Sequence, residues 1–495
     1  MDPITLEKIH STITSDLSSG DIQTLSLKVV VSTCIDSHGH LLYSGKTFFK
    51  FIAENVTELL DLALMDSPPP NPNPNRTNAK KPDQICTQEK QNPHGKDDSD
   101  DSDDSTYKNN NNEKIYFNGQ SYEECSKTAF LLLSNGSKYV VDALIKDYTF
   151  FIKATTILNQ NEISPKLAGR IAAIFVNIIN RSKESSINAI GFLTQLIRFI
   201  RDPSVFDLYH TMTMHKKRFN EMQILMSQVN LDSFVIEELS KVENSPDTFY
   251  DVDKKLNLCL FIQDCLKNSI LMHSFQNDRI LKKLIELMDS EVCKNNIYLL
   301  NQVWQAISLL PSPKTIPKMQ SLIKTALEII NKKVETIHIY HSSVFEFLSQ
   351  ITSLKPTMLN DKAKNDIILS IKFFIREFPS STSLMTPIFR VIRASMASRD
   401  FSHKVLSNLM PLFINLAQSK NRNAASASAT QFLADMERMK TVSIMINKSL
   451  SINAEYTAFY KSTFKKYLEE MNKPYGGPVT KFVNKEKPRL ERSCD

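Results

Sequence analysis

Apolar residues recur along most of this chain with the period of an α-helix. Leu167 and Ile171 begin one apolar stripe, and Ile190 and Leu193 lie in the next. Between these stripes the polar run at 181–184 predicts a turn. The pattern therefore predicts two helices joined as a hairpin over this stretch.

The same hairpin pattern repeats through the rest of the chain. Candidate hairpins begin near residues 164, 205, 251, 293, 337, 382 and 424, with spacings of 41 to 46 residues. A period of about 40–47 residues is that of HEAT or armadillo repeats, whose units bury their apolar faces only against neighbouring units. We therefore predict an all-α fold, an α-solenoid of HEAT/armadillo-like helical repeats whose last helix covers 456–470.

One segment differs from its surroundings in composition. Residues 67–114 open with SPPPNPNPN, contain DDSDDSDDS at 97–105 and close with four asparagines before Glu113. A segment with so few apolar residues cannot offset its ordering entropy by burial, so we predict one disordered acidic insertion. Ser99, Ser102 and Ser105 are candidate phosphorylation sites within it, and a solvated spacer is the alternative.

The predicted organisation has four parts. They are an N-terminal helical segment of the solenoid at 1–66, the disordered insertion at 67–114, a helical-repeat domain at 115–472 and a disordered basic tail at 473–495.

Glycine is scarce, with only 10 residues, and the 284 residues at 192–475 contain none. Tight turns and phosphate-binding loops depend on glycine, so its scarcity disfavours most β and α/β enzymes. The stretch from Gly39 to Lys46 and Thr47 resembles a phosphate loop, but it has five residues between its glycines where that loop requires four. We expect a loop that starts a helix there, no cofactor and no enzyme activity.

The histidines give one candidate metal motif. Glu335, His338 and His341 stand three apart, and on one helix two imidazoles could face a metal ion. No further strong ligand lies nearby in sequence, so we interpret them as surface or groove histidines and predict no metal. The sole tryptophan, Trp304, lies among apolar residues and is predicted to be in the core, with an exposed anchor for a partner as the alternative.

Charge and cysteine content suggest the compartment. The net charge of +6 is small for 495 residues, so nucleic acid is not expected as a partner. The odd count of 7 cysteines and the lack of an apolar leader favour a reducing compartment, the cytoplasm, with the nucleus as the other candidate. No stretch reaches the roughly 18–20 apolar residues that membrane insertion requires.

Basic residues gather around one predicted hairpin. We interpret them first as helix-end charges, with an acidic protein partner or a phosphopeptide as the alternative. The residues are Arg198, Arg201, His215, Lys216, Lys217 and Arg218.

Several segments between residue 46 and about 270 resemble, in their order, the SAPS family. They are KTFFKFIAENVTELLDLAL, CSKTAFLLLSNGSKYVVDALI, SPKLAGRIAAIFVNIINRSKESSINAIGFL and FIRDPSVFDLYHTMTM, followed by VNLDSFVIEELSKV and KKLNLCLFIQDCL. Near the C-terminus, EYTAFYKSTFKKYLEEMNKP is similar to the closing helix of that family. The resemblance implies a regulatory subunit that associates with a catalytic subunit of the protein phosphatase 6 type.

From this resemblance we expect a regulatory or scaffold subunit that binds a protein Ser/Thr phosphatase catalytic subunit and directs it to substrates, with a further scaffold protein as a second partner. The expected contact residues are Arg198, Phe206, Asp207 and His210. The alternatives are a HEAT-like adaptor in transport or trafficking and, less favoured, an RNA-binding solenoid.

Overall fold

The computed structural model describes residues 27–34, 42–43, 45–65, 115–117, 120–160, 163–182, 190–241 and 248–471. In these residues the secondary structure is helical except for one antiparallel pair of short strands, β1 (Ile115–Phe117) and β2 (Gln120–Ser121). The predicted all-α class is therefore confirmed. The candidate phosphorylation sites Ser99, Ser102 and Ser105, the rest of the insertion and the tail at 473–495 lie outside the described residues.

The chain divides into two units, and the division falls within the last turn of α13 (Thr248–Lys267). Unit 1 comprises Met1–Asp264 and Asn268–Leu271, and unit 2 comprises Cys265–Lys267 and Met272–Asp495. The range 115–472, expected as one helical-repeat domain, therefore contributes to both units.

The other described helices of unit 1 are α2 (Leu27–Thr33), α3 (Lys46–Glu54), α4 (Val56–Ala63), α5 (Tyr122–Ser134), α6 (Lys138–Ile145), η2 (Lys146–Tyr148), α7 (Thr149–Leu158), α8 (Pro165–Arg181), α9 (Ile190–Leu196), η3 (Ile197–Phe199), α10 (Pro203–Thr213), η4 (Lys217–Phe219), α11 (Asn220–Gln228) and α12 (Leu231–Ser240).

Unit 2 contains α14 (Met272–Phe275), α15 (Asp278–Asp289), α16 (Glu291–Lys294), α17 (Ile297–Leu309), η5 (Ile316–Lys318), α18 (Gln320–Asn331), α19 (Ile339–Leu354), η6 (Pro356–Met358), α20 (Asp361–Glu377), α21 (Thr382–Ser395), α22 (Arg399–Gln418), α23 (Ala424–Met439), α24 (Ile444–Ile452), α25 (Ala454–Phe459), η7 (Tyr460–Phe464) and α26 (Lys465–Met471).

Polar caps begin many of these helices where the sequence pattern predicts a start. The helices α8, α10, α13, α16, α19, α21 and α23 each begin within 3 residues of a predicted hairpin start. Ser164 caps α8 and Asp202 caps α10, and each is followed by a proline at the first helical position. A capping side chain satisfies an N–H group that the first turn leaves unpaired, and proline there has no N–H to lose.

The apolar residues between Phe48 and Ala63 lie on two helices, α3 and α4, which are separated at Asn55. The Nδ2 group of Asn55 donates a hydrogen bond to the carbonyl of Phe51 at 2.8 Å. Asparagine side chains that bond to the backbone compete with helical hydrogen bonding, which gives a physical reason for the break. Lys46 begins α3, so Lys46 and Thr47 of the expected loop already lie in the helix, and Gly45 before it has a φ of 131°.

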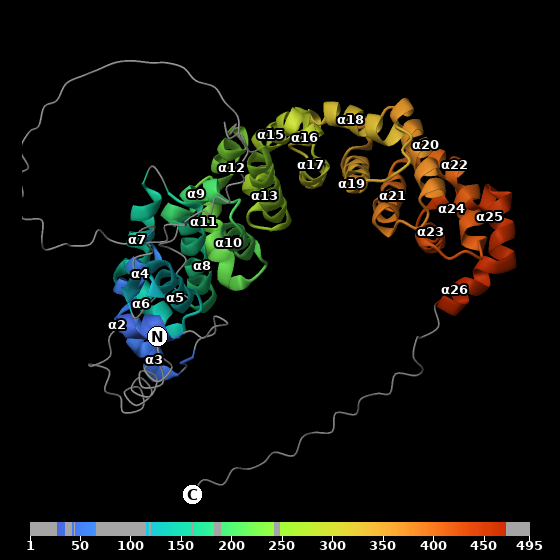
Figure 1. Ribbon diagram of the computed structural model, residues 1–495. Coiled ribbons are helices and arrows are strands. Elements are labelled where there is room, and N and C mark those ends of the chain that lie inside the picture. Colours follow the sequence, from blue (N-terminus) through green and yellow to red (C-terminus); the bar gives the residue numbers. More distant parts are fainter. Residues whose placement is uncertain are drawn as a thin grey trace, which may run out of the picture. The chain divides into compact units, whose positions relative to one another are not determined.

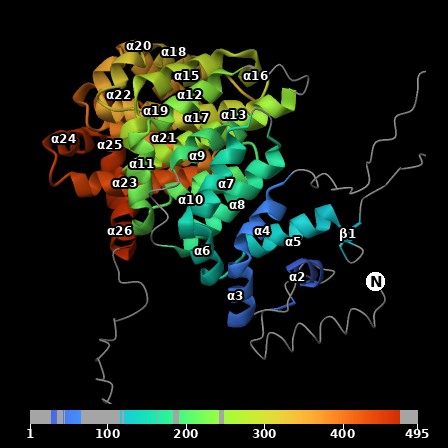
Figure 2. The same ribbon diagram turned by 90° about the vertical axis from the view of Figure 1, so that its left-hand side faces the viewer.

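In unit 1 the helices pack successively on one another. Helix α4 packs against α5, α5 against α8, and α8 against α10, and the first of these pairs is visible in Figure 2. Four phenylalanine rings from α7, α8 and α9 form a cluster in the core with centroid separations of 5.1 to 6.3 Å. They belong to Phe150, Phe151, Phe175 and Phe192.

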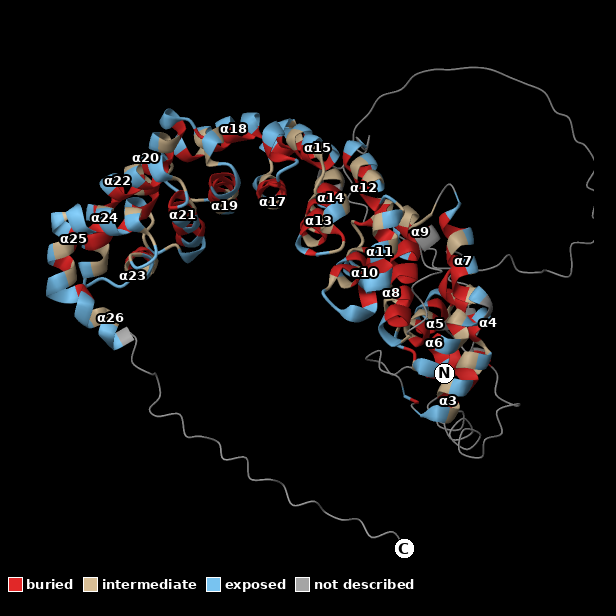
Figure 3. Cartoon of the chain, turned by 180° about the vertical axis from the view of Figure 1, so that it is seen from behind, coloured by how far each residue is buried: buried red, intermediate tan, exposed pale blue. Residues whose placement is uncertain are grey.

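In unit 2 alternate helices pack in two rows. One row runs from α15 through α17, α19 and α21 to α23, and the other runs from α18 through α20 to α22, as Figure 1 shows. Buried residues lie where these helices meet, and exposed residues cover the outer sides of α18, α20 and α22 (Figure 3). Trp304 of α17 is fully buried, 5.9 Å from the ring of Phe347 in α19, so its predicted core position is confirmed.

The predicted last helix, 456–470, contains a π-helical turn, η7, between α25 and α26. Phe459 and Phe464 are five residues apart, both are buried, and their ring centroids lie 5.0 Å apart. Because a π-turn brings residues five apart onto nearly one side, it allows both rings to face the core.

Candidate partner-binding surface

Helix α10 carries three of the four expected contact residues. Asp202 fixes its first turn, because the carboxylate accepts hydrogen bonds from the N–H groups of Ser204 at 2.9 Å and Val205 at 3.4 Å. The buried face of the helix consists of Val205, Leu208, Tyr209, Met212 and Thr213. Phe206, Asp207 and His210 lie outside that face, with Phe206 partly exposed and the other two exposed.

His210 forms a defined pair with a residue of α13. Its Nδ1 atom lies 2.7 Å from Oδ2 of Asp264, and the side chains are 49% and 22% exposed. Because an ionised carboxylate can only accept, Nδ1 is the donor in this contact. The ring of Phe206 stacks on His210 with centroids 6.2 Å apart and planes 13° apart. An aromatic ring, an imidazole and a carboxylate thus share one accessible surface of unit 1.

The packing of α13 is reinforced by buried charges that face α12. Lys254 lies 2.9 Å from Glu238, and Lys241 lies 2.6 Å from the same carboxylate. Both Glu238 and Lys254 are buried. Burial alone would raise the pKa of Glu238, but the hydrogen bonds from Lys241 and Lys254 outweigh it and hold the pKa below its usual value. This ionised cluster ties α12 to the helix that presents Asp264.

The fourth expected contact residue, Arg198, makes a contact inside unit 1. Its Nη2 group donates to the carbonyl of Leu158 at the end of α7, at 2.8 Å, and its guanidinium lies 4.8 Å from the ring centroid of Phe199. A cation at a helix C-terminus complements the helix dipole. Among the contacts of the described residues, none joins Arg198 to Phe206, Asp207 or His210.

Asp264, which accepts the hydrogen bond from His210, was not predicted from the sequence. The two residues are 54 positions apart, and Asp264 lies on a different helix. No local pattern in the sequence marks Asp264, because its partner lies on another helix.

The histidine motif has a structural explanation in unit 2. Helix α19 begins at Ile339, so Glu335 precedes the helix and the expected placement of all three residues on one helix is wrong. His338 is the N-cap, and its backbone N–H donates to Nδ1 of His341, at the third helical position, at 3.0 Å. His341 is only 1% exposed, so the expectation of a surface or groove histidine is wrong for it.

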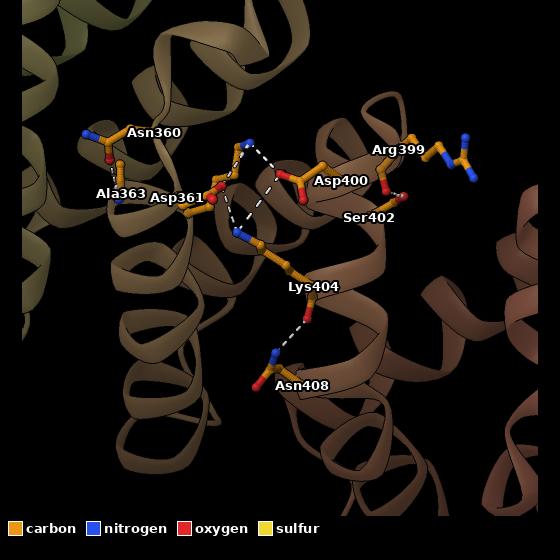
Figure 4. A network of polar contacts seen from close by, with 9 residues as sticks. Asn360, Asp361, Ala363, Arg399, Asp400, Ser402, Lys404 and Asn408 are labelled. Atoms are coloured by element: carbon orange, nitrogen blue, oxygen red, sulfur yellow. Dashed lines mark hydrogen bonds and ion pairs between the residues drawn. The ribbon is translucent and has the colours of Figure 1, made fainter.

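A network of four charged side chains links α20 to α22 in unit 2 (Figure 4). Lys364 lies 2.6 Å from Asp400, and Lys404 lies 2.8 Å from Asp361. Both carboxylates are largely exposed to solvent, so this network contributes little to the stability of unit 2.

No protein family model matches the chain, and neither a curated protein nor a solved structure matches it. Within the described residues, no three His, Cys, Asp or Glu side chains gather closely enough to hold a metal ion. The described helices also include none that is long and apolar enough to cross a bilayer.

Proposed function

We propose that this chain is a non-enzymatic α-solenoid of HEAT- or armadillo-like repeats that binds a protein Ser/Thr phosphatase catalytic subunit of the phosphatase 6 type and directs it to substrates. The exposed α10 surface carries this proposal, because it lies in the segment FIRDPSVFDLYHTMTM, which resembles the SAPS family. The order of helix packing is a second support.

Contacts between helices support a repeat architecture. Polar side chains join residues about one repeat apart in both units: Lys166 to Glu123 over 43 residues, Arg218 to Asn180 over 38, Lys318 to Asp278 over 40, Arg390 to Glu346 over 44 and Arg393 to Asp435 over 42. Stacked repeats produce this pattern, because each unit contacts mainly its neighbours in the sequence.

The chemistry of the α10 surface suits a protein partner. Phe206 offers an aromatic face, Asp207 an exposed carboxylate, and His210 an imidazole already oriented by Asp264. Aromatic anchors beside charged groups are typical of residues that dominate binding energy. Because His210 is already held by Asp264, less side-chain entropy is lost when a partner binds.

The proposed mechanism is recruitment. A scaffold that holds the phosphatase and its substrate together raises the effective substrate concentration without contributing a catalytic group. In this role the catalytic subunit binds at α10, and other surfaces of the chain bind the substrate or a further scaffold protein.

Binding of a purified protein Ser/Thr phosphatase catalytic subunit to the full chain tests the proposal. We expect the double variant Phe206→Ala/His210→Ala to bind at least about tenfold more weakly, which corresponds to about 1.4 kcal/mol. Tyr298→Ala is the matched control, because Tyr298 is an aromatic residue of α17 that is 71% exposed in unit 2, and it should change the affinity less than about twofold.

Two results would contradict the proposal: no measurable binding by the wild-type chain, or equal binding by the double variant and the control. Affinity purification followed by mass spectrometry provides an independent readout. Recovery of transport cargo or small GTPases without a phosphatase catalytic subunit would favour the trafficking adaptor instead.

A further inference from the structure

Unit 1 contains a cavity of about 520 Å³ beside the C-terminal end of α8. Its lining comes from the last residues of α8 and from the segment that runs from the end of α10 into α11. A volume of this size lies within the usual range for ligand sites, roughly 300–1,000 Å³.

The described lining combines an apolar part with a charged part. The apolar side chains belong to Ile179, Met212, Phe219 and Met222, all of which are buried. The charged side chains are those of Arg181, Lys217, Arg218 and Glu221. Three cations and one carboxylate give this lining a net charge of about +2 at neutral pH.

Two of the cations are held in place by asparagines. Arg218 donates from Nη1 to the carbonyl of Asn180 at 3.1 Å and from Nη2 to its side-chain oxygen at 2.7 Å, and its guanidinium lies 4.6 Å from the ring centroid of Phe219. Arg181 donates from Nε to Asn177 at 2.8 Å. Asn177 is itself buried and anchored by bonds to two backbone carbonyls.

These contacts leave donors available to a ligand. The terminal Nη groups of Arg181 take no part in the contacts of the described residues, and neither does the ammonium group of Lys217. Attraction to the negative end of the α8 dipole explains one cation, since Arg218 already binds a carbonyl of the last turn. The same attraction accounts for Arg181, which is the last residue of α8, but it does not explain why Lys217 also lines the cavity.

We propose that this cavity binds the phosphate group of a phosphoserine or phosphothreonine in a partner peptide. A phosphate monoester carries a charge of about −1.5 to −2 and three strong acceptor oxygens, which matches the lining better than the single charge of a carboxylate. Guanidinium groups bind phosphate oxygens in pairs, and an ammonium adds a point charge. The buried apolar part accommodates an apolar side chain next to the phosphorylated residue.

A peptide fits this site better than a nucleic acid does. Proteins that bind nucleic-acid backbones contact several successive phosphates along a basic groove. Here the cations line one partly open cavity whose lining also includes the carboxylate of Glu221. This inference concerns a different surface from α10 and does not depend on phosphatase binding.

The test uses the full chain and an immobilised peptide library with a fixed central phosphoserine and degenerate flanking positions. A second library with serine at the centre shows how much retention depends on the phosphate. We expect at least tenfold greater retention on the phosphorylated library and selection of an apolar residue near the phosphoserine. The best retained peptide is then labelled, and its affinity is measured by fluorescence anisotropy.

Two lysine variants test whether peptide binding depends on the cavity or only on the general positive charge of this surface. Lys217→Ala should weaken binding of the labelled peptide at least fivefold, because its ammonium lies in the lining. Lys216→Ala removes the same charge from the adjacent residue, which contacts the Phe219 ring at 6.0 Å outside the lining, and should change the affinity less than twofold.

Equal retention on the two libraries, or equal weakening by the two lysine variants, would overturn the inference. A single-stranded RNA oligonucleotide supplies the remaining comparison. The proposal is wrong, and the site is a nucleic-acid site, if three results hold together. The RNA binds more tightly than the peptide, its binding is weakened by Lys217→Ala, and its affinity falls with salt as steeply as expected for contacts to several phosphates.

Discussion

His341 makes the stability of unit 2 depend on pH. The residue stands at the third position of α19, and its Nδ1 atom lies 3.0 Å from the backbone N–H of His338, which donates to it in the neutral ring. Its ring also packs against Tyr340 and, with centroids 5.7 Å apart, against Phe374 of α20. The pKa of His341 is lowered from 6.5 to about 4, chiefly by burial. A backbone hydrogen bond with His338 raises the pKa in part, and the charge of the neighbouring His338 lowers it.

The sign of the effect follows from proton binding. Between pH 4 and pH 6.5 the unfolded chain binds a proton at this residue and the folded chain does not, so the free energy of unfolding rises with pH over this range. The contribution is fully present above pH 6.5 and is lost as the pH falls toward 4. With 1.36 kcal/mol for each unit of pKa difference, the loss is about 2 kcal/mol at pH 5 and about 3 kcal/mol at pH 4.

Urea unfolding followed by tryptophan fluorescence measures this loss. Trp304 is the only tryptophan of the chain, and it contacts Phe347 on the same helix as His341, so its emission reports on unit 2. The variant His341→Gln keeps a side-chain acceptor for the cap but does not titrate. The control is His403→Gln, which changes an exposed histidine of α22.

We expect wild type to lose about 2 kcal/mol relative to His341→Gln between pH 7 and pH 5. The His403→Gln control should follow the wild-type profile. If the difference between wild type and His341→Gln stays constant over this range, His341 is not held neutral by burial and the reasoning fails.

Three further predictions concern unit 1. Glu238→Leu should cost about 3–5 kcal/mol in urea unfolding followed by circular dichroism, because it leaves Lys254 buried without its carboxylate, whereas Glu238→Leu/Lys254→Met should lie within about 1 kcal/mol of wild type. Gly169→Ala places a Cβ 2.6 Å from the Asp202 carboxylate and should cost about 1 kcal/mol by displacing the α10 cap. In an Asp202→Ala background, Gly169→Ala should stabilise the fold by up to about 1 kcal/mol, because the carboxylate is no longer there to clash. If the effects of the two substitutions simply add in a double-mutant cycle, the clash is excluded. Phe175→Ala removes a ring in contact with three other phenylalanine rings and should cost about 3–5 kcal/mol, and a thermal shift of only a degree or two would show that the cluster tolerates the cavity.

Helical class and helix starts were accessible from the sequence because both depend on nearby residues. The 3.6-residue period places apolar side chains on one face, and Ser164-Pro165 and Asp202-Pro203 begin helices through contacts within a few positions. The break at Asn55 is also local, but hydrophobic periodicity does not detect it, because the apolar stripe continues across the break.

The candidate sites could be predicted only in part. Phe206, Asp207 and His210 were selected from one segment, and their positions on α10 follow from helix geometry. Arg218 stood in the basic group selected from the sequence, but Asp264 and Arg181 could not be selected in this way. Their roles depend on contacts such as the one from Arg218 to Asn180, which spans 38 residues.

The sequence was sufficient to establish an all-α chain, to place its helix starts and to identify a buried Trp304. It could not show which polar groups become buried or which charges meet, as with His341 at the start of α19 and Lys254 facing Glu238. The reason is physical: helix formation and capping are decided within about four residues, whereas desolvation and ion pairing depend on helices that pack together from distant parts of the chain.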